Sequence, residues 1–191
     1  MHCLAFRRAN LSSWARALSM LLFAVATGLS ARISVPLPFS PVPLTLQVLV
    51  VVLSGFVLGV RDGVIAQILY LQAILLGAPM TATGLAGPSA FLSPTAGYLW
   101  AFPISAAVAG WFSHRCLSKK ALWRGVGGIG ALAVIYALGM TWLAGFVGGL
   151  ANAWRLGVVP FAGVDVLKVI IATTALTVAD SHKLRFWDIT A

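Results

Sequence analysis

Long uncharged stretches dominate the pattern of polar and apolar positions along this chain. No Asp, Glu, Lys or Arg occurs in residues 33–60, 63–113 or 125–154. A bilayer crossing needs roughly 20 mainly apolar residues, so each stretch is long enough for one or two crossings. The pattern predicts an all-α polytopic membrane protein in which residues 1–191 form one integral-membrane domain. We expect six transmembrane helices, at about residues 17–31, 44–58, 63–76, 95–112, 125–150 and 161–179.

Two of the expected connections between helices are unusually apolar. Residues 36–43 contain four prolines, which lack a backbone N–H and fix φ, so this segment cannot form a regular helix. Residues 81–94 carry no charge at all. Non-helical backbone is tolerated at membrane depth only where it is buried in protein or lines a cavity. We expect these two loops either to fold over the outer end of the bundle as a lid or to be ordinary surface connectors.

The charged residues fix an expected orientation. Only 9% of the residues are charged, against roughly 25% in a soluble domain. The net charge of +9 does not indicate nucleic-acid binding, because the basic residues punctuate apolar runs and form no stripe with aromatic side chains. Short cytoplasmic loops carry an excess of Lys and Arg. Six crossings put both termini in the cytoplasm and place most of the basic residues there: Arg7, Arg8, Arg16, Arg61, Arg115, Lys119, Lys120, Arg124, Lys183 and Arg185.

Asp165 and Lys168 are the strongest candidates for chemistry inside the membrane. They are three residues apart, so on a helix they project from one face. A charge near the centre of a span costs about 2.5–3.5 kcal/mol on insertion scales, and such residues are usually functional. The pair is either a structural ion pair or a polar ligand site facing a cavity. The aspartate accepts hydrogen bonds and the lysine donates them, so the pair suits a neutral ligand group with both N–H and C=O. Alternatively, the lysine alone could hold a ligand carboxylate.

One further polar residue and the lack of catalytic motifs limit the possible functions. Gln47 is a neutral polar group within an apolar helix, where it could contact a ligand or make an interhelical hydrogen bond. The chain has no G-x-x-x-x-G-K-[ST] phosphate loop, no zinc-protease motif and no nucleophile elbow. We therefore expect no enzyme activity, no metal and no cofactor.

Several runs of sequence resemble the BioY family, the substrate-binding (S) components of energy-coupling-factor biotin transporters. Residues 31–38 (Ala-Arg-Ile-Ser-Val-Pro-Leu-Pro) and 40–47 (Ser-Pro-Val-Pro-Leu-Thr-Leu-Gln) resemble the first loop and second helix of that family. Further matches are Tyr70-Leu71 before Gly77-Ala78-Pro79, the Pro94-Thr95-Ala96-Gly97-Tyr98 element, and Pro160-Phe161 leading to Asp165 and Lys168. The resemblance covers about residues 24–172. It departs at Ser93 and Ala96, where the family pattern has glycine, and at Arg32, where a neutral polar residue is more usual.

The resemblance implies six helices, biotin bound near the outer face and a covering loop between the first two helices. It implies that Asp165 and Lys168 contact the ligand, which suits the two N–H groups and one carbonyl of a ureido ring. Arg32 or a group in the 81–95 loop is then expected to hold the ligand carboxylate. The candidate substrate-binding residues are Asp165, Lys168, Gln47, Arg32, Thr95, Tyr98, Pro36, Pro38 and Gly84. The small residues Ala24, Gly28 and Ala31 are expected to face a partner.

The sequence and the resemblance together predict a biotin-binding subunit in the lipid of the cytoplasmic membrane. A transmembrane coupling protein and a pair of cytoplasmic ATPases would supply the energy. Three alternatives stay open: an S component for another small vitamin, a self-contained secondary transporter with Asp165 as a proton or ion relay, and a structural membrane partner in which the charge pair only pins the bundle.

Overall fold

The computed structural model describes residues 12–114 and 120–189 as a bundle of helices. The predicted basic positions Arg7, Arg8, Arg115 and Lys119 lie outside the described residues. The main elements are α1 (Ser13–Arg32), β1 (Ser34–Val35), β2 (Leu44–Thr45), α2 (Gln47–Leu75), a 3₁₀ turn (Gly87–Leu92), α3 (Ala96–Ser113), α4 (Lys120–Val147), α5 (Leu150–Gly157) and α6 (Val159–Ile189). The two strands form one short antiparallel pair, with Ser34 opposite Thr45.

The helices are those of a multi-pass membrane protein. Within the described residues, four helices are long and apolar enough to cross a bilayer: α1, α2, α4 and the Val159–Asp180 part of α6. Large apolar side chains lie on the outside of the bundle, for example Leu22 on α1 and Ile170 on α6, each more than half exposed. A soluble protein would not present such surfaces on every helix, whereas a bilayer solvates them.

Helix α2 is a hairpin of two antiparallel halves, residues 47–58 and 60–75. Gly59 has φ 78° and ψ −174°, a conformation that glycine adopts at little steric cost. Gln47 Nε2 donates to Tyr70 Oη at 2.7 Å, although a straight helix would separate these positions by about 35 Å at 1.5 Å per residue. The sequence predicted helices 44–58 and 63–76 with a polar turn at Arg61-Asp62. The predicted end of the first of these helices near Gly59 is confirmed, but the polar turn was wrong, because the chain reverses at Gly59 and both polar residues are helical.

Small residues let α3 approach this hairpin closely. A Cβ on Gly110 would lie 2.7 Å from the carbonyl carbon of Gly59 and from the nitrogen of Val60. The break at Gly59 also disrupts the normal helical pairing of the Phe56 carbonyl. Ser113 Oγ donates to that carbonyl at 3.3 Å, and Arg124 Nε donates in turn to Ser113 Oγ at 3.3 Å. The turn is therefore supported from both α3 and α4.

Two further boundaries differ from the sequence prediction. The helix expected over 125–150 ends at Val147, because Gly148 and Gly149 have φ values of 80° and 119°. The residues that follow form the short helix α5, where a plain loop was expected. The last helix, expected over 161–179, continues to Ile189, since neither glycine nor proline interrupts the chain after Gly163.

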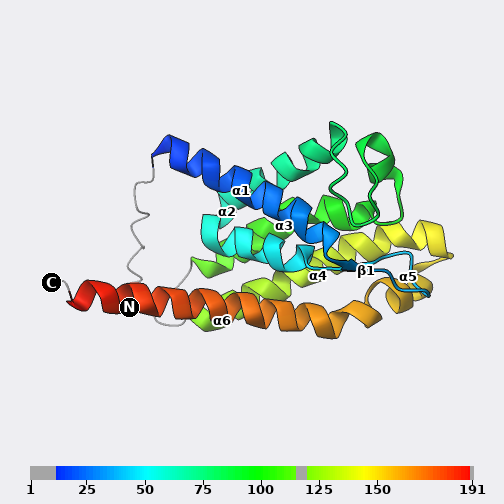
Figure 1. Cartoon of the computed structure of the whole chain (residues 1–191). Helices are drawn as coiled ribbons and strands as arrows, with labels where there is room; N and C mark the ends of the chain where they lie inside the picture. The colour runs from blue at the N-terminus through cyan, green and yellow to red at the C-terminus, as the bar shows by residue number, and fades with distance from the viewer. Residues whose placement is uncertain (1–11, 115–119, 190–191) are drawn as a thin grey trace.

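The two ends of the bundle differ (Figure 1). The connections 33–46, 76–95 and 148–158 gather at one end, which we call the loop end. The start of α1, the turn at Gly59 and the last part of α6 lie at the opposite end, the hairpin end. Ion pairs concentrate there: Arg16 with Asp62 at 2.7 Å, and Asp180 with Arg124 at 2.8 Å and with Lys120 at 3.1 Å.

Candidate functional site

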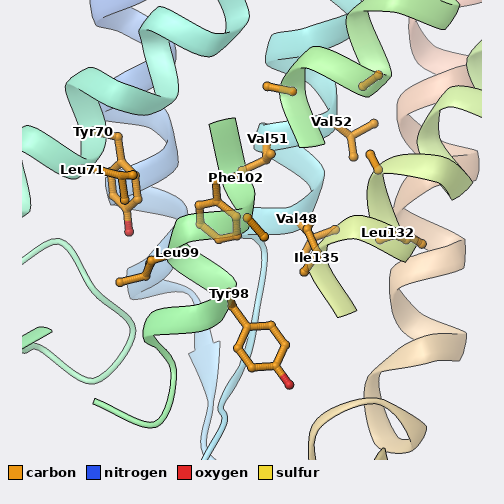
Figure 2. Packing of buried hydrophobic residues seen from close by; sticks show 14 of the residues in the cluster. Val48, Val51, Val52, Tyr70, Leu71, Tyr98, Leu99, Phe102, Leu132 and Ile135 are labelled. Atoms are coloured by element: carbon orange, nitrogen blue, oxygen red, sulfur yellow. The ribbon is translucent and has the colours of Figure 1, made fainter. Parts of the chain in front are cut away.

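A cavity that is partly open to the outside lies toward the loop end, and the space within it together with the adjoining open solvent amounts to about 610 Å³. Its wall combines an apolar floor with a small number of polar groups, the usual composition of a small-molecule site. Figure 2 shows part of the packing behind it, with Tyr98, Leu99 and Phe102 projecting from α3 and Ile135 from α4. The lining residues are Val42, Pro43, Leu44, Thr45, Gln47, Val48, Thr81, Ala82, Thr95, Tyr98, Leu99, Phe102, Ile135, Tyr136, Gly157, Phe161 and Asp165.

Asp165 and Lys168 lie on one face of α6, as their spacing predicted, and they form an ion pair. Lys168 Nζ donates to Asp165 Oδ1 at 2.6 Å, and both side chains are about 5% exposed. The same ammonium donates to the backbone carbonyl of Thr45 at 2.5 Å. Asp165 lines the cavity, whereas Lys168 lies behind it. The lysine thus links the carboxylate on α6 to the strand that ends the first loop.

Tyr136 holds the other oxygen of the same carboxylate. It comes from α4, and its hydroxyl donates to Asp165 Oδ2 at 2.6 Å, within the range of a charge-assisted O–H···O⁻ bond. The sequence analysis did not identify it. The available signal was that Tyr136 is a polar group in the middle of the uncharged stretch 125–154, one of three tyrosines in the chain.

Gln47 lies at the cavity wall with its amide group already engaged. Its Nε2 donates to Tyr70 Oη, and Tyr70 Oη donates to the Met80 carbonyl at 3.1 Å. Both side chains are buried, Tyr70 completely. This chain of hydrogen bonds ties the start of α2 to the segment after its second half. Gln47 therefore both faces the cavity and joins two helices, the two roles that the sequence left open.

Tyr98 is placed by glycines on two other elements. Its hydroxyl donates to the Gly157 carbonyl at 2.9 Å. A Cβ on Gly139 of α4 or on Gly157 of α5 would overlap the Tyr98 side chain. Thr95, one turn earlier, shares a 3.0 Å hydrogen bond with Ser93. These contacts bring Tyr98 and Thr95 to the cavity wall, next to the loop that precedes α3.

The polar groups of the wall present mainly acceptors to the cavity. The hydroxyl protons of Tyr98, Tyr136 and Thr81 are used on partners within the chain. An ionised carboxylate such as Asp165 accepts only, and it has about four lone-pair sites, of which Lys168 and Tyr136 use two. The inner end of the cavity is therefore suited to a ligand group that donates N–H bonds.

The Pro-rich loop lies over this end of the bundle and bounds a second cavity. Ser40 Oγ donates to the Leu156 carbonyl at 2.7 Å, which ties the loop to α5. The second cavity, of about 470 Å³, is lined by Ser34, Pro36, Leu37, Ser40, Pro41, Pro43, Ala82 and Thr83. Pro43 and Ala82 line both cavities, so they separate the two spaces.

The structure brings some of the candidate substrate-binding residues together and leaves others apart. Asp165, Gln47, Thr95 and Tyr98 line the first cavity, and Lys168 contacts Asp165 behind it. Pro36 lines the second cavity. Arg32, Pro38 and Gly84 are exposed and line neither of these two cavities, so a ligand contact from any of them stays a prediction.

The small residues of α1 point inward. Ala24 and Ala31 are 5% and 0% exposed, and a Cβ on Gly28 would lie 2.6 Å from Met80 Sδ. This face of α1 packs against the same chain, as small residues do where helices approach closely. In the chain alone these small residues serve internal packing, and a contact with a partner stays a prediction.

Comparison with known proteins finds one family throughout. The model of the BioY family matches residues 7–184. A "Probable biotin transporter BioY" from Pyrococcus horikoshii is 40% identical over 159 residues, 83% of this chain and 90% of that protein. The "Biotin transporter BioY" of Thermotoga maritima is 35% identical over 79% of this chain and 87% of that protein. A crystal structure of the S-component for biotin from an ECF-type ABC transporter has the same fold, with TM-score 0.78 and 19% identity over 90% of this chain and 95% of that one.

Proposed function

The chain belongs to the BioY family, and on that premise we propose that it is a biotin-binding membrane subunit that mediates biotin uptake. The names of its relatives support the ligand, and the fold match supports the type of subunit. The observation that carries the proposal within the chain is the Asp165 carboxylate, buried at the wall of a cavity and fixed by Lys168 and Tyr136.

The chemistry of biotin fits this wall. Its ureido ring has two N–H donors beside one carbonyl, and its fused ring is otherwise apolar. The Asp165 carboxylate accepts an N–H, while Phe161, Ile135 and Phe102 supply apolar surface for the ring system. The valerate carboxylate needs donors, and Thr81 and Thr95 at the cavity wall could supply them only by giving up their bonds to the Leu85 carbonyl and to Ser93. In a dry cavity each such hydrogen bond matters, because an unpaired polar group there is costly.

We propose six crossings of the cytoplasmic membrane: α1, the two halves of α2, α3, α4 and α6. The hairpin end carries Arg16, Arg61, Lys120 and Arg124, whereas Arg32 and Arg155 lie toward the loop end. The excess of basic residues favours the cytoplasm for the hairpin end and for both termini. The cavity then faces the outside, where a scarce vitamin has to be captured.

Energy for uptake would come from other proteins. The sequence contains no phosphate-binding loop for a nucleotide. We therefore propose that the chain works with a transmembrane coupling protein and a pair of cytoplasmic ATPases. Uptake by cells that express the chain should stop when the ATPases are inactivated, whereas a self-contained transporter would instead depend on the proton gradient.

The direct test is binding of labelled biotin to the purified chain in detergent, with desthiobiotin, riboflavin and thiamine as competitors. We expect tight binding that desthiobiotin alone displaces, and that Asp165→Asn abolishes or strongly weakens. Asp180→Asn is the matched control, since Asp180 lies on the same helix at the hairpin end and is paired with Arg124; it should leave biotin affinity unchanged. Absence of binding by folded wild-type protein would reject the biotin assignment, and displacement by riboflavin or thiamine would point to another vitamin.

A further inference from the structure

We propose that Tyr136 is a positioning residue of the ligand site, which acts through Asp165 and not by a contact of its own with the apolar ring. This inference rests on the proposed biotin function. It assigns a role in recognition to α4, on which the sequence predicted no ligand-site residue. Its basis is the 2.6 Å hydrogen bond from the Tyr136 hydroxyl to Asp165 Oδ2.

The Asp165 carboxylate is held by donors from two elements. Lys168, one turn away on α6, fixes Oδ1, and Tyr136 fixes Oδ2 from across the cavity wall. With Lys168 as its only donor, the carboxylate could rotate about its Cβ–Cγ bond and turn toward the ammonium. With both donors in place, its remaining lone pairs have a fixed direction into the cavity. A preorganised acceptor of this kind binds more tightly, because less ordering is required on binding.

The hydroxyl of Tyr136 also completes the solvation of a buried negative charge. In the empty cavity, water can replace a missing donor to the carboxylate. When a ligand fills the cavity, water is displaced, and a carboxylate that lacks the tyrosine would lose that donor. A hydrogen bond to a charged group contributes about 1.5–3 kcal/mol, which corresponds to about a 10-fold to 150-fold change in affinity. The penalty falls on the bound state, so it appears in the dissociation constant.

The chain offers a close control. Tyr70 is also a buried tyrosine, and it donates its hydroxyl proton to the Met80 carbonyl beside the cavity region. No hydrogen bond is described between Tyr70 and Asp165 within residues 12–114 and 120–189. Tyr70→Phe therefore removes a comparable hydroxyl without touching the carboxylate. Any effect of that change should be independent of Asp165.

The experiment is a double-mutant cycle on biotin affinity with Tyr136→Phe, Asp165→Asn and the double variant, each checked for folding by size exclusion and circular dichroism. We expect Tyr136→Phe to weaken binding about 10-fold to 100-fold in the wild-type background and less than threefold in the Asp165→Asn background. Tyr70→Phe should have the same effect in both backgrounds. Equal losses from Tyr136→Phe in both backgrounds would overturn the proposal, as would unchanged affinity in the wild-type background.

A spectroscopic readout covers the case in which Asp165→Asn leaves no measurable binding. The chain has only four acidic side chains, all aspartates, so its carboxylate infrared bands can be assigned by difference with Asp165→Asn. Tyr136→Phe should shift the Asp165 band in the empty protein, and Tyr70→Phe should not. An unshifted Asp165 band would reject the positioning role. Failure of wild-type protein to bind biotin would instead remove the proposed function on which this inference depends.

Discussion

Removing one partner of the Asp165–Lys168 pair should destabilise the chain more than removing both. The two side chains are each about 5% exposed, and their charged atoms are 2.6 Å apart. Breaking a buried pair by neutralising one member costs about 3–5 kcal/mol, because the other charge is left without compensation, whereas replacing the whole pair is often close to neutral. Lys168→Met leaves the carboxylate with Tyr136 as its described donor, and Asp165→Asn leaves the ammonium with the Thr45 carbonyl.

These costs convert to thermal shifts that are easy to measure. For a chain of this size, 1 kcal/mol corresponds to about 2–4 °C in Tm, so each single variant should unfold roughly 6–20 °C earlier than wild type. The Asp165→Asn, Lys168→Met double variant should lose less than either single variant. Tryptophan fluorescence during thermal unfolding in detergent is a suitable assay, since the chain contains seven tryptophans.

The same variants separate a structural pair from a binding site. Losses that add, so that the double variant is as unstable as the sum of the two single variants, would refute the description of a coupled buried pair. A stable double variant that still binds biotin with wild-type affinity would show that the pair only holds α6 in the bundle. A stable double variant without binding is the outcome that the cavity geometry predicts, because Asp165 lies at the wall.

The remaining predictions concern side chains that shape the two ends of the bundle. Gly157→Ala should displace the Tyr98 hydroxyl, because a Cβ at this position would overlap it. We expect the free energy of unfolding to fall by about 1–3 kcal/mol and biotin to bind more weakly. Wild-type stability and affinity would contradict the packing described. Ser113→Ala should lower the free energy of unfolding by about 1–3 kcal/mol, because the Phe56 carbonyl loses its donor, while biotin affinity of the folded protein stays unchanged. Ser40→Ala removes the hydrogen bond from the first loop to the Leu156 carbonyl. It should speed biotin dissociation severalfold in a filter-binding assay without lowering Tm. An unchanged dissociation rate would show that this hydrogen bond does not restrain the loop.

The sequence was most informative where a single physical constraint dominates. Uncharged stretches predicted a multi-pass membrane protein, because charge is costly in hydrocarbon, and four of the described helices are long and apolar enough to cross a bilayer. The spacing of Asp165 and Lys168 predicted their contact, because residues three apart share a helix face. Prolines at 36–43 excluded a helix in the first loop, and that segment contains no helix.

Features that depend on several elements at once were harder to predict. The reversal of α2 uses the φ of one glycine, and Gly59 is one of nineteen glycines in the chain. A helix end was predicted next to it, but a reversal at this single residue also depends on Gly110 of α3, which packs against the turn. Tyr136 was missed for the same reason: its partner lies 29 residues away on α6. The role of the small residues on α1 could not be fixed from sequence, because small residues suit both internal packing and a partner.

The two ends of the molecule are held together by different kinds of contact. At the hairpin end, Arg16 binds both carboxylate oxygens of Asp62, and Asp180 takes donors from Lys120 and Arg124. The first loop is attached by a two-residue strand pair, by hydrogen bonds from Ser40 and Lys168, and by apolar packing of Val42 and Leu44. Local opening is governed by the contacts that must break in that region, and for the first loop these include the bond from Lys168 to the Thr45 carbonyl. Because Lys168 binds both the loop and Asp165, a ligand that engages the carboxylate acts on the group that also holds the loop in place.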